Sequence, residues 1–414
     1  MIEEGYLFEP QDMGGVTLEE VIEAYYDCRR RKRTTVNALE FEMDYERHCI
    51  DLWHELNEHR YEPRRSIAFI VDYPVKREIF AADFRDRVVH HLIARRIYPL
   101  LEKQFLTDSY STQTGKGTLF GIQRVEQHIR QCSKGYTRDC YVMKLDISGY
   151  FMSISKERLY DCIRTFLEIH YRQPGLPMLL YLLRKTIFNR PEKNCIRKVP
   201  KSRWRGLPRN KTLFGSDGHY GLPIGNLTSQ LLALLYLDPL DHLITGPWGV
   251  EHYGRYVDDM VLVHPSKLHL LKVRCCITEW LATRGLRLHP KKMYLQHYSK
   301  GVLFVGGMIK PGRKYISRRT QGRLYAKIHW YNDMLENAEV GADQIEDMVA
   351  CLNSYLGMMH HYHSLRLFHK VRHRITPSLY CHAFIIKRGN RAKIHSRSGL
   401  SRLGQRRRNA ICRR

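Results

Sequence analysis

Three aspartates stand where the sequence predicts that apolar strands end. Asp146 lies near the end of the apolar segment 140–147, and Asp258 and Asp259 separate two short apolar segments. Carboxylates are poor strand formers, so their presence there needs a chemical reason. Hard cations such as Mg²⁺ prefer carboxylate oxygens and leave open positions for phosphate oxygens. Two such ions about 4 Å apart can activate a 3′-hydroxyl and stabilise the leaving pyrophosphate. The pattern therefore favours a metal site for nucleotidyl transfer, and the alternative is an ordinary polar turn at Asp258 and Asp259.

The overall charge indicates a polyanionic partner. The 414 residues include 68 Lys and Arg against 42 Asp and Glu, which gives a formal net charge of +26. Such a surface attracts polyanions, so a nucleic acid is the first hypothesis. Because 43% of the residues are hydrophobic, the chain can build cores, and the disordered and fibrous classes are excluded. At roughly 150 residues each, two or three domains are expected.

The sequence offers no segment for export or for a membrane. No run approaches the roughly 18 apolar residues of a membrane span, and the first residues lack the basic start and apolar core of a signal peptide. The 11 cysteines include no CxxC pair and match neither a disulfide framework nor a zinc site. We therefore expect a soluble, cytoplasmic protein with reduced thiols and no membrane partner.

Helices and strands are expected to position the aspartates. Hydrophobic spacing and β-branched content predict both kinds of element. The predicted strands are 66–71, 140–147, 253–257 and 260–263, the last two forming a hairpin around Asp258 and Asp259. The predicted helices cover most of 1–60, begin near Asp86, Ser155 and Gly225, and occupy 343–375. Residues 190–220 are rich in Gly, Pro, Lys and Arg and are predicted to form a long basic loop.

Three motifs in order resemble those of a known family. Tyr256-Val257-Asp258-Asp259 resembles the YxDD box of reverse transcriptases, and segment 144–151 (KLDISGYF) resembles their first aspartate motif. Between them, segment 221–230 (GLPIGNLTSQ) resembles one branch, the reverse transcriptases of diversity-generating retroelements. Most other reverse transcriptases have Gln where Ile224 stands and Pro where Gln230 stands. The resemblance spans about residues 60 to 375 and lies within the bacterial reverse transcriptases that are similar to those of group II introns and retrons.

The resemblance implies an α/β (α+β) right-hand polymerase with fingers, a palm built on an antiparallel sheet, and a helical thumb. It divides the chain into a helical N-terminal extension at 1–60, fingers and palm at 61–312, a thumb at 313–385 and a basic flexible tail at 386–414. The tail is expected to bind RNA phosphates or a protein partner.

The resemblance also implies roles for individual residues. Asp146, Asp258 and Asp259 would be catalytic, and with Ile147 they would form the site of two Mg²⁺ ions. The residues expected around the incoming deoxynucleoside triphosphate are Lys76, Arg77, Phe151, Ile224, Gly225, Gln230 and Lys292, with Phe151 as a steric gate against a 2′-hydroxyl. The expected primer grip is Phe304, Gly306 and Gly307.

For several of these residues a structural role is the alternative. Phe151 and Ile224 can be core residues, since apolar side chains beside glycines commonly are. Lys76, Arg77 and Lys292 can be solvated charges. The cluster His360-His361-Tyr362-His363 is expected to contact duplex from a thumb helix rather than to bind zinc, because no Cys or carboxylate lies at finger-like spacing.

The function implied is RNA-directed DNA synthesis that copies a template RNA into cDNA with errors at adenines, for diversification of a target gene. The implied partners are the template RNA, the cDNA/RNA duplex and a small basic helical accessory protein, and the implied source is bacterial or phage-encoded. The alternatives are a retron, group II intron-like or phage-defence reverse transcriptase, and, from another class, a non-catalytic RNA-binding protein on a polymerase fold.

Overall fold

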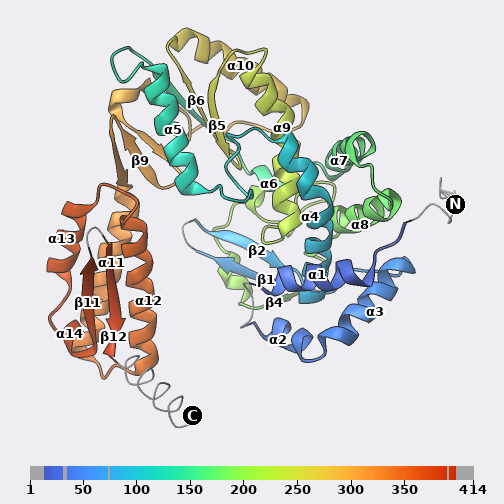
Figure 1. Cartoon of the computed structure of the whole chain (residues 1–414), viewed down its shortest axis with the longest axis horizontal. Coiled ribbons are helices and arrows are strands. Elements are labelled where there is room, and N and C mark those ends of the chain that lie inside the picture. The colour runs from blue at the N-terminus through green and yellow to red at the C-terminus, as the bar shows by residue number, and fades with distance from the viewer. Residues whose placement is uncertain (1–13, 31–34, 73–74, 389–390, 398–414) are drawn as a thin grey trace, which may run out of the picture. The chain divides into compact units, whose positions relative to one another are not determined.

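The computed structural model describes residues 14–30, 35–72, 75–388 and 391–397. The chain divides into two compact units (Figure 1). The first unit contains Met1–Gly117 and Met143–Leu295, and the second contains Thr118–Val142 and Gln296–Arg414. Helices and antiparallel strand pairs occur in both units, so the expected mixed α/β class is confirmed.

The first unit begins with three helices, α1 (Leu18–Arg29), α2 (Val36–Met43) and α3 (Tyr45–Asn57). Helix α1 begins where it does because Thr17 and Glu20 form a capping box. It packs against the long helix α4 (Phe84–Gln104), which in turn contacts α9 (Leu227–Thr245). Helices α1, α2 and α3 agree with the helical prediction for residues 1–60. Residues 1–13 and 31–34 of that range lie outside the described residues.

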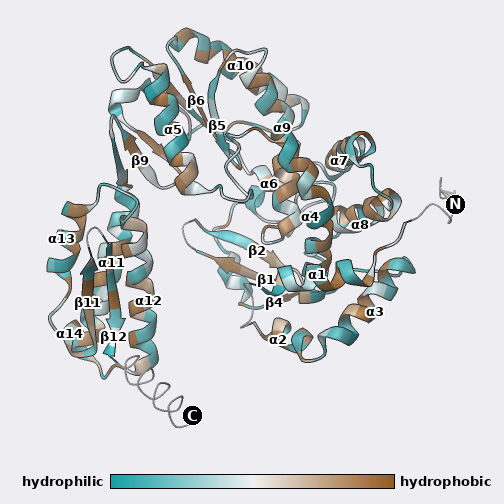
Figure 2. Ribbon diagram, in the orientation of Figure 1, coloured by the Kyte–Doolittle hydropathy of each residue, from teal (hydrophilic) through white to brown (hydrophobic). Residues whose placement is uncertain are grey.

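A small sheet lies beside these helices. Strand β1 (Ser66–Val71) pairs antiparallel with β2 (Arg77–Ala81) and parallel with β4 (Cys195–Arg197). The apolar sequence of β1 appears largely brown in Figure 2. Strand β4 comes from the segment 190–220, which also contains the short 3₁₀ helices η2 (Lys201–Trp204) and η3 (Arg209–Lys211). The predicted basic loop is therefore partly folded onto this sheet.

A four-stranded sheet in the order β5-β6-β3-β7 carries the aspartate motifs. Its strands are β3 (Tyr141–Asp146), β5 (His252–Tyr256), β6 (Asp259–His264) and β7 (Tyr294–His297). Helix α9 contacts β5, and helix α10 (Lys267–Thr283) contacts β6. Because α9 packs against α4, α10 and this sheet, it is apolar on nearly every side, as its sequence predicts.

Three further helices follow β3. They are α6 (Tyr150–Ser153), α7 (Lys156–His170) and α8 (Leu176–Phe188). Ser155 caps α7 as predicted, since its side chain accepts from the N–H of Arg158. Helices α7 and α8 pack against each other, and α7 also contacts α9.

The second unit combines helices with two small sheets. It contains α5 (Thr118–Cys132), η4 (Tyr298–Lys300) and a sheet in the order β10-β9-β8, whose strands are β8 (Val302–Phe304), β9 (Gly307–Lys310) and β10 (Arg313–Ile316). Its helices are α11 (Arg318–Asn337), α12 (Ala342–Met359), α13 (Leu365–Arg374) and α14 (Leu379–His382). A core that includes Leu324, Met348 and Leu352 holds them together.

Part of the segment 386–414, which the sequence predicted as a flexible tail, is folded. Residues 383–396 form a hairpin of β11 (Ala383–Arg388) and β12 (Arg391–Ser396) that packs on α12. Asn353 fixes this hairpin, because its Nδ2 donates to the carbonyl of Ile394 and its Oδ1 accepts from the N–H of the same residue, each at 2.8 Å. Ile394 is buried, and this apolar contact outweighs the surrounding basic residues. Residues 398–414 lie outside the described residues.

Within the described ranges, no helix is both long and apolar enough to cross a membrane. The ten cysteines from Cys28 to Cys381 are all free thiols.

Candidate active site

Strand β3 presents Lys144 and Asp146 on one face of its sheet, because side chains two residues apart on a strand point the same way. Asp146 is buried. Lys144 donates from Nζ to Oδ1 of Asp259 on the neighbouring strand β6 at 3.1 Å. The sheet therefore brings the two aspartate motifs together.

Asp258 occupies the tip of the β5–β6 hairpin. The register pairs Tyr256 with Asp259, so the two turn residues are Val257 and Asp258, and the prediction of a turn at Asp258-Asp259 is wrong by one residue. Val257 has a φ of +59°, in the left-handed region that a β-branched residue enters only at a cost. Strand pairing and side-chain contacts to the turn outweigh that cost, and they leave Asp258 at the tip with Asp259 as the first residue of β6.

The three carboxylates influence one another. Burial, followed by the charges of Asp146 and Asp259, raises the pKa of Asp258 to about 7. Burial also raises the pKa of Asp259, although Lys144 opposes the shift. Carboxylates that are desolvated and close together destabilise their charged forms, so the cluster favours a cationic ligand.

The segment after α10 brings Lys292 to Asp146. The N–H of His289 donates to the carbonyl of Asp146 at 2.7 Å, which ties this segment to the end of β3. Lys292 then donates from Nζ to both carboxylate oxygens of Asp146, at 3.0 Å each. Its side chain remains 53% exposed, so the ammonium is accessible to a ligand that approaches Asp146.

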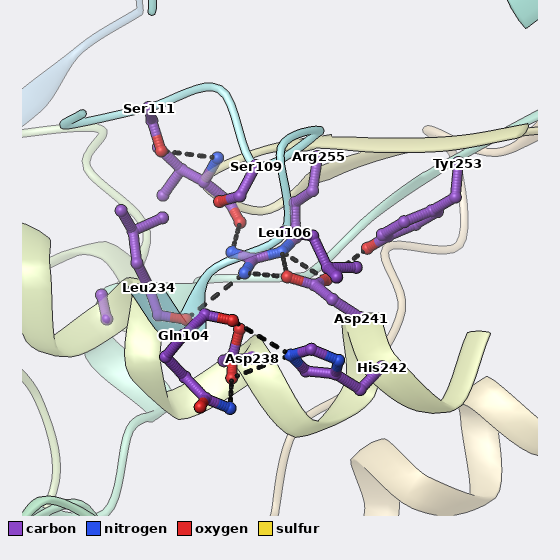
Figure 3. Close-up of polar contacts among 12 residues, drawn as sticks. Gln104, Leu106, Ser109, Ser111, Leu234, Asp238, Asp241, His242, Tyr253 and Arg255 are labelled. Atoms are coloured by element: carbon purple, nitrogen blue, oxygen red, sulfur yellow. Dashed lines mark hydrogen bonds and ion pairs between the residues drawn. The ribbon is translucent and has the colours of Figure 1, made fainter. Parts of the chain in front are cut away.

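A buried polar network lies next to the hairpin (Figure 3). Arg255, the residue before Tyr256, donates from Nε to Oδ1 and Oδ2 of Asp241 on α9, at 2.7 and 3.0 Å. Its Nη1 donates to the carbonyl of Val257 at 2.9 Å. The N–H of Val257 donates to Oγ of Ser111 at 3.3 Å. The turn that bears Asp258 is thus held by Arg255 of its own strand β5, which is fixed to α9, and by Ser111 of a distant segment.

The donor set suits hard divalent cations, because it consists of carboxylate oxygens. Among the described residues, however, no three His, Cys, Asp or Glu side chains are arranged to hold an ion together as they stand. Lys292 and Lys144 engage oxygens of Asp146 and Asp259 instead. Asp146, Asp258 and Asp259 are the residues that would hold such ions. Ile147, the fourth expected member, is buried and forms a single bridge with Leu288.

Ile224 and Gly225 lie against strand β2. The N–H of Phe80 donates to the carbonyl of Ile224 at 3.0 Å. Gly225 has a φ of +123°, and a Cβ there would lie 2.9 Å from Cγ2 of Ile79, so this close approach requires glycine. The side chain of Ile224 is half-buried.

Gln230 and Phe151 lie on either side of the segment that contains Ile224 and Gly225, Gln230 by sequence in α9 and Phe151 by a backbone contact. Gln230 is exposed in the first turns of α9, where its Oε1 accepts from Oγ1 of Thr112 at 3.3 Å. Phe151, half-buried on α6, follows the turn after Asp146, and its carbonyl accepts from the N–H of Leu222 at 2.8 Å. The structure therefore brings these residues into one region with the first aspartate motif.

Lys76 and Arg77 stand at the start of β2. Arg77 is exposed, and Lys76 donates from Nζ to the carbonyl of Arg205 at 2.7 Å. Both cations are accessible, which fits either a ligand contact or a solvated strand end.

Phe304, Gly306 and Gly307 belong to the second unit, so their relation to the aspartates stays a prediction. They do form a hairpin, in which Phe304 pairs with Gly307 and Gly306 has a φ of +91°. The histidine cluster 360–363 belongs to the same unit. There, His360 accepts from Nε of Arg391 at 3.1 Å, and Nδ1 of His363 accepts from the N–H of Lys314 at 3.1 Å.

Sequence reasoning missed three residues that organise this region: Lys144, Asp241 and Arg255. A charge inside an otherwise apolar element needs a partner, and that signal was available for Asp241 in α9 and for Arg255 in β5. The identity of the partner was not available, because Asp241 and Arg255 come from different elements.

The four-stranded sheet gathers three aspartates, and two of them each carry a lysine contact. Together with the smaller sheet and the long helices, this arrangement defines a right-hand polymerase. The family model described as "Reverse transcriptase (RNA-dependent DNA polymerase)" matches residues 76–309. This match covers more than half of the chain, which therefore belongs to the reverse transcriptase family. Reverse transcriptases use divalent metal ions and deoxynucleoside triphosphates.

Solved structures of telomerases are similar to this chain. A telomerase from Candida albicans, in complex with the TWJ fragment of telomeric RNA, has a TM-score of 0.46 and 11% identity over 77% of this chain and 56% of its own. The apo telomerase from Candida tropicalis has a TM-score of 0.45 and 12% identity over 76% of this chain and 60% of its own. The chain thus spans less than two-thirds of either telomerase chain. These overlaps are loose, and the assignment depends on the family match. No curated protein matches the chain.

Proposed function

We propose that this protein is an RNA-directed DNA polymerase. The observation that carries the proposal is the cluster of Asp146, Asp258 and Asp259, with Lys292 on Asp146 and Lys144 on Asp259. The family match supports it, since the matched residues 76–309 include the whole cluster. In this assignment the four-stranded sheet is the palm, the sheet of β1, β2 and β4 belongs to the fingers, and the helices of the second unit form the thumb.

The residues of the site have distinct roles in this proposal. Divalent cations bound by the three aspartates would activate the primer 3′-hydroxyl and stabilise the leaving pyrophosphate. Lys76 and Arg77 hold the triphosphate with their exposed cationic groups. Lys292 has three N–H donors beside the carboxylate of Asp146 and can donate to a phosphate oxygen. Phe151, on the helix after Asp146, faces the sugar and excludes a 2′-hydroxyl.

Primer extension tests this function. The purified chain, given a primed RNA template, deoxynucleoside triphosphates and Mg²⁺, should extend the primer, and Asp258→Asn should reduce extension to background because a charged ligand of the site is lost. Asp258→Asn should fold normally, because a carboxamide has nearly the same volume. Absence of extension by the parent, or near-parental extension by Asp258→Asn, contradicts the proposal.

We further propose that the chain serves a diversity-generating retroelement, with two Mg²⁺ ions and adenine-mutagenised cDNA. Ile224 and Gln230 support this branch, because the segment 221–230 resembles it more than the other bacterial reverse transcriptases. Its partners would be a template RNA, the cDNA/RNA duplex and a small basic helical accessory protein, in the cytoplasm. The DNA that flanks the coding sequence should then contain a pair of near-identical repeats that differ at adenines. Absence of such a repeat pair favours a retron, group II intron-like or phage-defence role.

A further inference from the structure

The segment Lys193–Phe214, called the basic strap from here on, is a strongly charged part of the first unit that the catalytic chemistry does not use. It contains no Asp or Glu, and its cationic residues are Lys193, Arg197, Lys198, Lys201, Arg203, Arg205, Arg209 and Lys211. All of these except Lys211 are exposed. Of the eight, only Arg203 forms an ion pair among the described residues, with Asp72.

The strap is folded rather than loose. Its strand β4 continues the small sheet beside β1, and Lys198 donates from its N–H to the carbonyl of Ala68 at 2.9 Å (Figure 1). The anchor is Glu78 of β2, which is fully buried. Its carboxylate accepts from Nε1 of Trp204 at 2.6 Å, and from Oγ1 of Thr212 and the N–H of Leu213 at 2.7 Å each.

The apolar side chains of the strap pack against the small sheet, whereas its cationic side chains, apart from Lys211, are exposed. Leu213 packs with Ala68 and Phe80, and Trp204 and Phe214 pack against this group. Charged hydrogen bonds to a buried carboxylate are among the stronger ones in proteins. The strap therefore pre-orders a row of exposed guanidinium and ammonium groups that would otherwise repel one another.

The far end of the strap reaches the first aspartate motif. η3 contacts α6, and the carbonyl of Asn210 lies 2.7 Å from the position of a Cβ on Gly149, which has a φ of +58°. Gly149 is in the turn between Asp146 and Phe151. The near end is β4, which pairs with β1, and Lys76 donates to the carbonyl of Arg205 in the middle of the strap. The strap thus runs from the fingers to the turn beside the catalytic carboxylates.

We propose that the basic strap is a binding surface for the phosphate backbone of single-stranded RNA, held on the fingers by Glu78 and leading to the active site. Exposed cations without acidic partners neutralise phosphates at little cost, and seven exposed cations within one folded segment can contact several phosphates of the same strand. The proposal deepens the proposed function, since the RNA bound here would be the template.

Salt-dependent RNA binding tests the proposal in the full chain. In the strap variant, Lys198, Lys201 and Arg205 are each replaced by Gln, and in the control the exposed Lys103, Lys267 and Lys272 of α4 and α10 are each replaced by Gln. The net charge is the same in both variants. Affinity for an unstructured single-stranded RNA is measured across a salt series, and circular dichroism verifies folding.

The strap variant should lose about 0.7 of salt slope per lost phosphate contact, hence about 2 in total, and about 100-fold in affinity near 0.1 M salt. The control should stay close to the parent. RNA should also protect the strap of the parent chain from trypsin. Equal losses of RNA affinity in both variants would mean that only the overall charge acts. An unchanged salt slope in the strap variant would mean that the strap binds something other than RNA. Either result overturns the proposal. Binding does not require synthesis, so an inactive parent that binds RNA through the strap contradicts the proposed polymerase function alone.

Discussion

Arg255 and Asp241 form an ion pair in the interior of the first unit, with side chains that are 0% and 1% exposed. The same guanidinium donates to the carbonyl of Val257 at 2.9 Å and to that of Leu234 at 3.3 Å. Asp241 also accepts from the hydroxyl of Tyr253 at 2.6 Å. Helix α9 is therefore connected through one side chain to the turn that carries Asp258 (Figure 3). A buried pair of this kind is weak evidence for stability by itself, but here it fixes the strained Val257 next to Asp258, which we propose to be catalytic.

Arg255→Lys should lower kcat while leaving the KM for deoxynucleoside triphosphates almost unchanged. Lysine keeps the charge opposite Asp241, but its single ammonium cannot also reach Val257 and Leu234. The turn is then free to shift, and a misplacement of about 1 Å can reduce the rate by about 10²-fold. Steady-state primer extension separates kcat from KM.

Tyr253→Phe is the matched control. It removes the other donor to Asp241 but leaves the contact between Arg255 and Val257 in place. Thermal unfolding should show a loss of about 1 to 3 kcal/mol, because a buried carboxylate loses one donor, whereas kcat should stay near the parental value. Equal losses of kcat in both variants would mean that the network only stabilises the fold.

Glu78→Ala should release the basic strap without unfolding the first unit. Three donors, from Trp204, Thr212 and Leu213, lose their acceptor. Hydrogen bonds to a charged group contribute about 1.5 to 3 kcal/mol each, so local opening should become easier by several kcal/mol. Limited trypsin digestion should then cleave between Lys198 and Lys211 at least about tenfold faster than in the parent, since each 1.4 kcal/mol of easier opening is a factor of ten.

Glu62→Ala supplies the control for this experiment. Glu62 is exposed and pairs with Lys185 on α8, away from the contacts of the strap. Cleavage of its strap at the parental rate is expected. Accelerated cleavage in Glu62→Ala, or unchanged cleavage in Glu78→Ala, contradicts the assignment of Glu78 as the anchor.

Much of this architecture follows from local pattern. The apolar strand 66–71, the cap at Ser155 and the apolar helix after Gly225 are predicted from residues close in sequence. The turn lies at Val257 and Asp258, one residue from the predicted position, because a β-branched residue with positive φ contradicts local preference. Contacts from Arg255 in β5 and from the distant Ser111 hold it there. The hairpin 383–396 was missed for a related reason, since basic composition conceals an apolar contact with α12.

The unfolding free energy should decrease as pH falls below about 6.5, in part through His90. This side chain on α4 is buried, and its Nδ1 lies 2.7 Å from Oγ1 of Thr228 on α9. Burial, followed by the charges of His91 and Arg87, lowers the pKa of His90 from 6.5 to about 3. The unfolded chain therefore binds a proton between these values while the folded chain does not. Stability is fully present above pH 6.5 and is lost by about 1.4 kcal/mol at pH 5.5.

His90→Gln should remove that part of the pH dependence, because glutamine can pair with Thr228 but does not titrate. Urea unfolding at pH 7.5 and 5.5 measures the difference. His170→Gln, which replaces an exposed histidine at the end of α7, should keep the parental pH dependence. A parental slope in His90→Gln would show that other groups account for the effect.

Ile224→Gln should lower the error frequency of cDNA synthesis. In the wider family a glutamine at this place can hydrogen-bond near the nascent base pair, whereas isoleucine offers neither donor nor acceptor. Ile224 is half-buried and its carbonyl is fixed by Phe80, so a longer polar side chain can be accommodated without moving the backbone. Apolar contacts alone separate similar ligands by only about 1 to 3 kcal/mol, so the parent should misincorporate often.

Sequencing cDNA made on one defined RNA by the parent, by Ile224→Gln and by Ile224→Leu measures the effect, with leucine as the apolar control of equal volume. A decrease with glutamine but not with leucine supports a role in fidelity; equal error frequencies at adenines in all three would make Ile224 a packing residue and remove the mechanistic support for the diversity-generating branch.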